Sequence, residues 1–94
     1  MMTLNDACDV LRVNPGDNDD LITSLLDAIP DYIEVTTGMS LNDQSAEPLV
    51  DTVSGFLLKL WYFGDHADDQ ALKRTIDCLL KAISIKARDY QDVD

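Results

Sequence analysis

The residues best suited to acid–base chemistry lie in the polar loop GDHADD, residues 64–69. His66 is the only histidine of the chain, and Asp65 and Asp68 lie on either side of it. A carboxylate beside a histidine can orient the imidazole as a general base. Such a base also needs a nucleophile, and no serine or cysteine lies nearby in the sequence. We therefore interpret His66 as a solvated loop residue.

The acidic run DNDD, residues 17–20, raises the question of a calcium loop. An EF-hand loop carries glycine at its sixth position and glutamate at its twelfth. Counted from Asp17, these positions hold Ile22 and Ala28. Acidic side chains are also favourable in the first turn of a helix, where they interact with the helix dipole or cap free N–H groups. The run therefore indicates the start of a helix and not a calcium site.

Zinc and cofactor chemistry find no support either. A structural zinc site needs about four ligands, whereas the chain offers Cys8, the distant Cys78 and one histidine. Both cysteines lie in segments with helical apolar spacing, so we expect them to be buried free thiols. Walker loops, dinucleotide fingerprints and nucleophile elbows are absent from the sequence. We predict no catalytic residue, no metal and no cofactor, and hence a protein that is not an enzyme.

The dominant pattern is the helical spacing of apolar residues. It recurs in four segments, and no alternation typical of strands is found. We predict an all-α fold, a compact bundle of about four helices over residues 4–11, 18–37, 48–63 and 69–86. We expect one domain spanning 1–94, with a polar flexible tail from about 89–94. The predicted core consists of the residues on the apolar faces, which are Leu25, Ile29, Ile33, Val53, Phe56, Leu57, Leu60, Trp61, Ile76, Leu79 and Leu80.

Three residues are predicted to fix helix ends. Thr3, with an acidic residue three positions later, has the spacing of a capping box. Gly38 suits a left-handed C-cap, after which Met39 can make the apolar contact that often accompanies such caps. Leu41 is then expected to fold back onto the same face of the helix. The motif would turn the chain sharply and hold the next segment against the helix.

Proline residues mark two further features. Pro30 interrupts the apolar stripe of the 18–37 segment, but the stripe keeps its phase, so we expect one kinked helix. Residues 42–48 are predicted to form a polar linker. Pro48 suits the first turn of the following helix, with Ser45 or Glu47 close enough to cap it.

The net charge of −11, from 18 acidic and 7 basic residues, limits the range of partners. A nucleic-acid reader needs a basic face, and so does a protein that binds an anionic membrane. We therefore expect no sequence-specific nucleic-acid binding and no membrane binding. The charge serves solubility or repulsion from DNA. The N-terminus has no signal-peptide pattern, which favours the cytoplasm.

The charges are unevenly distributed along the chain. Acidic residues gather at 17–20 and 65–69, whereas five of the seven basic residues lie between 73 and 88. Surfaces of opposite sign on one small domain suit head-to-tail packing between copies. Solvated helix faces are the alternative interpretation.

Together these features resemble a known family. The run TLNDACDVLRV is followed by DNDDLITSLLDAIPDYIEVTTGMSL and then by LVDTVSGFLLKLWYFGDH and a last helix. This organisation is similar to that of the small head–tail connector (adaptor) proteins of tailed bacteriophages and prophages. The resemblance covers about Thr3 to Leu80. It implies a structural virion protein of about twelve copies in a ring beneath the portal, which joins head to tail and continues the DNA channel.

The resemblance also implies partners, a location and surface residues. The partners are other copies of the chain, the portal protein, and a stopper or tail-completion protein. The location is the head–tail junction of the virion, after assembly in the host cytoplasm. The C-terminal part is expected to face the portal, with Lys81, Lys86, Arg88 and Tyr90 as candidates. The acids expected to face the channel or a neighbouring subunit are Asp17, Asp19, Asp20, Asp65, Asp68 and Asp69. An alternative function is an acidic DNA mimic that inhibits a DNA-processing protein.

Overall fold

Five helices make up the regular structure of the residues that the computed structural model describes, which are 3–64 and 69–91. They are α1 (Leu4–Leu11), α2 (Asp19–Thr37), α3 (Leu41–Gln44), α4 (Pro48–Phe63) and α5 (Asp69–Gln91). This part of the chain contains no strand. The all-α prediction is thus confirmed, and the predicted boundaries of the first three long helices agree with α1, α2 and α4 to within one residue.

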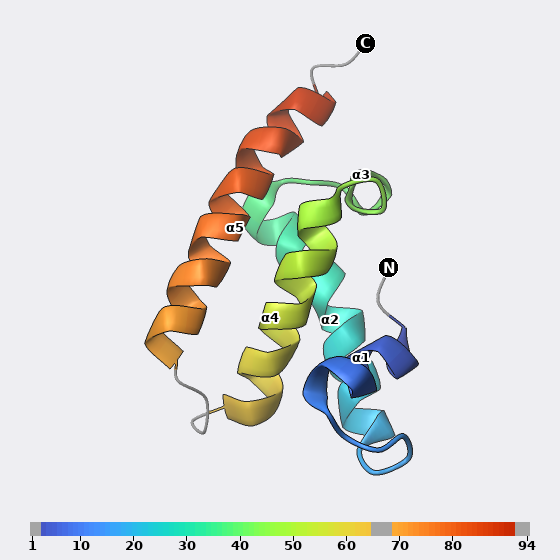
Figure 1. Ribbon diagram of the computed structural model, residues 1–94. Coiled ribbons are helices and arrows are strands. Elements are labelled where there is room, and N and C mark those ends of the chain that lie inside the picture. Colours follow the sequence, from blue (N-terminus) through green and yellow to red (C-terminus); the bar gives the residue numbers. More distant parts are fainter. Residues whose placement is uncertain (1–2, 65–68, 92–94) are drawn as a thin grey trace.

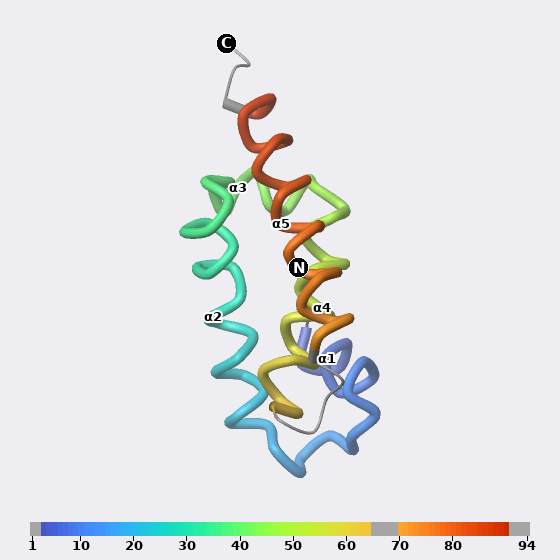
Figure 2. The backbone as a smooth tube through the Cα atoms, turned by 90° about the vertical axis from the view of Figure 1, so that its left-hand side faces the viewer, coloured from blue at the N-terminus to red at the C-terminus, as the bar shows by residue number. Residues whose placement is uncertain are grey.

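Helices α2, α4 and α5 form the body of the molecule, and the shorter α1 covers one end of it (Figure 1). Helices α2, α4 and α5 pack against one another, and α1 packs on α2 and α4. Helix α4 runs opposite to α2 and α5 and contacts all three of the other long helices. Figure 2 shows the C-terminal turns of α5 projecting beyond the rest of the bundle.

The core draws on every long helix. Among the predicted core residues, the buried ones are Ile29, Ile33, Val53, Leu57 and Ile76, and the partly buried ones that pack against them are Leu25, Phe56, Leu60, Trp61, Leu79 and Leu80. Leu58 is also fully buried, although its position falls beside the predicted stripe. The reason is the central place of α4, because a helix covered on several sides buries more than one stripe.

The first helix begins as the sequence predicts. The N–H of Asp6 donates to the Thr3 hydroxyl at 3.2 Å, and the N–H of Thr3 donates to the Asp6 carboxylate at 3.1 Å. This reciprocal pair is a capping box. It satisfies two backbone donors at the start of α1. Cys8, on the face of α1 that packs against α2 and α4, is buried as expected.

Helix α2 continues through Pro30 and ends at a left-handed glycine. Gly38 has φ of 80°, and its N–H donates to the carbonyl of Glu34 at 2.8 Å. Met39 follows and is completely buried, whereas Leu41 is 45% exposed. The prediction that Leu41 folds back onto α2 is therefore wrong. Met39 takes the inward position, and the chain starts a new helix at Leu41 after the N-cap Ser40.

The predicted polar linker contains a helix and two buried polar residues. Helix α3 occupies its first part, and Gln44 and Glu47 are each 4% exposed. The side-chain amide of Gln44 donates to the carbonyls of Pro30 and Met39, both at 3.0 Å. These bonds fix the turn against α2, so the segment is part of the fold and not a loose connection.

Helix α5 is longer than expected. It continues past residue 86 to Gln91, so residues 89–91 of the predicted tail belong to a helix, and residues 92–94 lie outside the described part. The helix continues because Ala87 is buried and Tyr90 packs against the core. Cys78, expected to be buried, is exposed, because it lies on the side of α5 opposite to the core.

Candidate interaction surfaces

A buried carboxylate connects the start of α4 to the end of α5. Glu47 is the N-cap of α4 and accepts the N–H of Leu49 at 3.0 Å. Its other oxygen lies 3.3 Å from the ammonium of Lys86 and accepts the hydroxyl of Tyr90 at 3.5 Å. Two predicted portal-facing residues, Lys86 and Tyr90, thus have partners within the molecule. Sequence reasoning considered Glu47 as a cap but had no signal for its contacts with α5.

The surroundings of Glu47 make it more acidic. Burial acts to raise the pKa of this carboxyl, but the Leu49 N–H, the Lys86 ammonium and the Tyr90 hydroxyl outweigh burial and hold the pKa below its ordinary value. A carboxyl with a lowered pKa in the folded state stabilises the fold above its unfolded pKa of about 4.3. That contribution is lost as the pH falls through the folded pKa.

We expect Glu47→Gln to lower the free energy of unfolding by about 1 kcal/mol at pH 7, because it removes a charged cap and an ion pair. The wild-type protein should lose this advantage below about pH 4, so the two unfolding curves should converge there. Urea denaturation between pH 3 and pH 7 measures the difference. Glu34→Gln, at an exposed position of α2, serves as control. A constant gap between wild type and Glu47→Gln at every pH would contradict this role.

The acidic loop lies at the end of the bundle where α2 begins. An open depression of about 380 Å³ is lined by residues 16–21. Asp19 accepts the N–H of Gly16 at 2.8 Å, and the amide of Asn18 donates to the hydroxyl of Tyr62 at 2.6 Å. Asp17 and Asp20 are exposed. The structure therefore brings Asp17, Asp19 and Asp20 together, whereas Asp65, His66 and Asp68, and the side chain of Asp69, lie outside the described residues.

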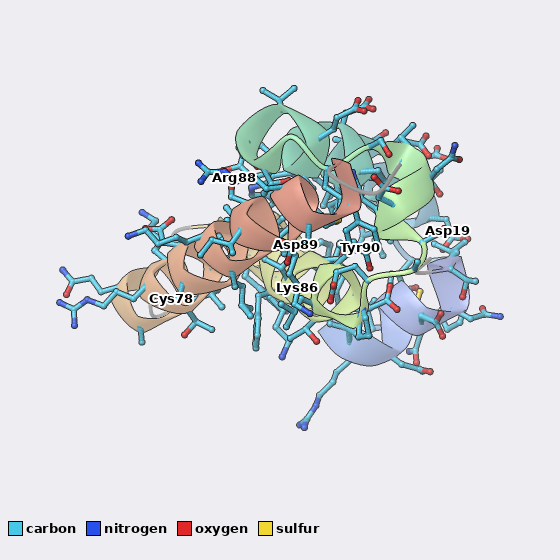
Figure 3. All side chains as sticks on the ribbon, turned by 90° about the horizontal axis from the view of Figure 1, so that it is seen from above. Asp19, Cys78, Lys86, Arg88, Asp89 and Tyr90 are labelled. Atoms are coloured by element: carbon cyan, nitrogen blue, oxygen red, sulfur yellow. The ribbon has the colours of Figure 1, made fainter. Side chains whose placement is uncertain are left out.

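The other two predicted portal-facing residues lie on a different side of α5. Lys81 and Arg88 are exposed. Figure 3 shows Arg88 on one side of the helix and Lys86 with Tyr90 on the other. Lys81 and Arg88 therefore belong to the outer face of α5, away from Glu47.

Several large apolar side chains also remain accessible. On α2, Val35 is 85% exposed and Leu21 is 50% exposed. Tyr32 is partly exposed, and its ring meets Trp61 edge-on, with centroids 5.3 Å apart. On α5, Ile85 is 59% exposed. Such residues suit contacts with other proteins better than they suit a small-molecule site.

Residues 3–64 and 69–91 contain neither a cluster of metal ligands nor a helix that could span a membrane. No three side chains of the His, Cys, Asp and Glu types cluster there as metal ligands would. None of the helices in residues 3–64 and 69–91 has the length and apolar character to cross a membrane.

Comparison with known protein families identifies a family model that matches most of the chain. The model of a family described as phage gp6-like head–tail connector protein matches residues 1–71. This range includes α1 to α4 and the beginning of α5. Neither a curated protein nor a solved structure matches the chain.

Proposed function

The chain belongs to the phage gp6-like head–tail connector family, and from this premise we propose that it forms a ring beneath the portal of the virion. The family supports a structural role in joining head to tail. The ring contains about twelve copies, encloses the path of the DNA and offers its far side to a stopper or tail-completion protein. Assembly takes place in the host cytoplasm. The family match over three quarters of the chain carries this proposal.

The acidic character of the chain supports passage of DNA. With a net charge of −11 per copy, the ring repels phosphate groups and limits adhesion of the DNA to its wall. Asp17 and Asp19, which gather at one end of the bundle, are candidates for the channel wall. Asp65, Asp68 and Asp69 remain candidates from the sequence alone.

We assign the portal contact to the projecting end of α5. These turns extend beyond the other helices (Figure 2) and carry the exposed residues Arg88 and Asp89. Lys86 and Tyr90 are held by Glu47, so the base of this projection is tied to the bundle. Because this end of α5 is already helical, little conformational entropy is lost when a partner binds it.

Removing the projecting end is expected to abolish portal binding and to preserve the fold. A chain that ends at Ala87 keeps every buried apolar residue. The test is co-purification of the tagged chain with the portal protein from phage-infected cells. The full-length chain should retain the portal, and the shortened chain should retain less than about a tenth of it.

Tyr90→Phe, which removes only the hydroxyl contact with Glu47, is the matched control and should still bind the portal.

Two results would decide against the proposal. Absence of portal from the full-length sample would refute a role beneath the portal. Capture of a DNA-processing protein in its place would favour the acidic-mimic alternative.

A further inference from the structure

The outer face of α2 carries a regular row of four carboxylates and one serine. Its positions alternate by four and three residues, all are exposed, and they lie opposite the buried Ile22, Ile29 and Ile33. We call this row the acidic stripe; it consists of Asp20, Ser24, Asp27, Asp31 and Glu34.

The outer face of α5 carries a row of the opposite sign. Its positions follow the same four-and-three alternation, all are exposed, and they lie opposite the buried Ile76, Ile83 and Ala87. We call this row the basic stripe; it consists of Arg74, Cys78, Lys81, Ile85 and Arg88. Figure 3 shows Cys78 on the outer side of α5.

The two stripes match in spacing and length. Carboxylates recur every seven residues at Asp20, Asp27 and Glu34, and cations recur every seven residues at Arg74, Lys81 and Arg88. Each set spans about 21 Å along its helix at a rise of about 1.5 Å per residue. Helices α2 and α5 both run toward the same end of the bundle but are inclined to one another (Figure 1). A neighbouring copy must therefore be tilted as well as rotated to bring its α5 alongside α2.

In the described residues, the charges of the two stripes form no ion pairs within one molecule. Both face away from the core, and in the described part of the chain Arg74, Lys81 and Arg88 take part in no ion pair; Lys86, on the other side of α5, is the cation that has one. The charges are thus exposed and complementary, but on different helices. A heterologous contact between copies is the arrangement that joins them.

We propose that the basic stripe on α5 of one copy binds the acidic stripe on α2 of the next copy. This inference rests on the proposed ring and specifies the surface that closes it. Arg88 lies at the end of the basic stripe, where this surface meets the proposed portal contact, so the contact between copies is assigned chiefly to Arg74 and Lys81. Exposed ion pairs contribute little individually, so apolar contacts must supply part of the affinity. Ile85 lies within the basic stripe, and Val35 borders the acidic stripe; both are largely exposed. Asp77 is three residues after Arg74 and four before Lys81, so its negative charge weakens the positive potential of the basic stripe. We therefore expect salt to screen the contact readily and make it reversible.

Charge reversal on either stripe tests the contact. One variant carries Asp27→Lys and Asp31→Lys, and the other carries Arg74→Glu and Lys81→Glu; these are exposed mid-helix positions. Sedimentation at about 20 mM salt measures self-association without the portal, and about 0.5 M salt should weaken it. Each variant is expected to weaken association by at least about tenfold. A chain with all four substitutions should recover part of the lost association, because the central charges of the two stripes have exchanged signs while Asp20, Glu34 and Arg88 keep theirs.

A matched control separates the stripe from net charge. Asp9→Lys with Asp51→Lys changes the net charge as the first variant does, but at exposed positions of α1 and α4. This control should associate at least as strongly as wild type. Circular dichroism confirms that each variant is folded.

Alkylation of Cys78 gives an independent measurement. This exposed thiol lies in the middle of the basic stripe, whereas Cys8 is buried. Cys78 should react at least about fivefold more slowly at low salt than at high salt, because the thiol is covered in the assembled copies. The decrease in rate should follow the fraction of the protein that is assembled. Three results would overturn the proposal: no association of the wild type at low salt, no effect of either reversal, or no recovery in the four-substitution chain. Portal capture is measured separately, so its failure would refute the proposed function and leave this contact standing.

Discussion

Leu58→Ala is expected to lower the free energy of unfolding by about 2–5 kcal/mol, the usual cost of a cavity left by a leucine. Leu58 is completely buried on α4, the helix that contacts all the other long helices. The neighbouring structure is expected to relax only partly into the space, because α4 is packed against α1, α2 and α5. Urea denaturation monitored by the single tryptophan, Trp61, gives the measurement, since this residue lies on the same helix.

Leu41→Ala is the matched control for this prediction. It removes the same atoms from a side chain that is 45% exposed, so its effect should be within about 1 kcal/mol. The sequence pattern alone favours the opposite order, because it placed Leu41 against α2 and left Leu58 outside the core. Equal costs for the two substitutions would contradict the packing of α4 described above.

Gln44→Glu is expected to cost about 3 kcal/mol or more at pH 7. The amide nitrogen of Gln44 donates to two backbone carbonyls in a buried site. A carboxylate of the same shape cannot donate, and it would place a negative charge beside two carbonyl oxygens. Both carbonyls would also lose a donor. The turn from α2 into α3 is therefore expected to open or the whole domain to unfold.

The pH dependence gives this prediction a specific signature. In the folded protein the introduced carboxyl would keep its proton more readily than in the unfolded chain, because only the protonated form can donate. The variant should therefore lie nearest to wild type below about pH 4 and fall behind as the pH rises. Asn42→Asp makes the same chemical change at an exposed position of α3 and should be nearly neutral. A defect in Gln44→Glu that is independent of pH would argue against the two hydrogen bonds.

Local signals made the helices predictable from the sequence. The Thr3 capping box, Gly38 and Pro48 each act on backbone groups within a few residues, so their effect can be read from neighbouring positions. The apolar spacing of α2 and α4 identified the core faces for the same reason. The end of α5 was missed because polar residues surround Ala87 and Tyr90, and composition there is typical of a tail.

The polar contacts of the fold could not be predicted in this way. Gln44 bonds to a carbonyl 14 positions earlier, and Glu47 contacts Tyr90 across 43 positions. Nothing in the local sequence distinguishes these residues from the exposed Asn42 and Ser45 beside them. Their burial depends on how α3 meets α2 and α5, which only the tertiary arrangement defines. The excess of basic residues between 73 and 88 is visible in the sequence, but its match in spacing with the acidic stripe on α2 depends on which helix faces are exposed.

The Glu47 carboxylate also has a mechanical consequence. One of its oxygens holds the first turn of α4, and the other holds the last turns of α5. A force that draws the C-terminal end of α5 away from the bundle therefore acts on the same side chain that caps the first turn of α4. Together with the packing of Ala87 and Tyr90, this side chain couples the C-terminal end of α5 to the start of α4, so an outward movement of that end would also disturb the first turn of α4.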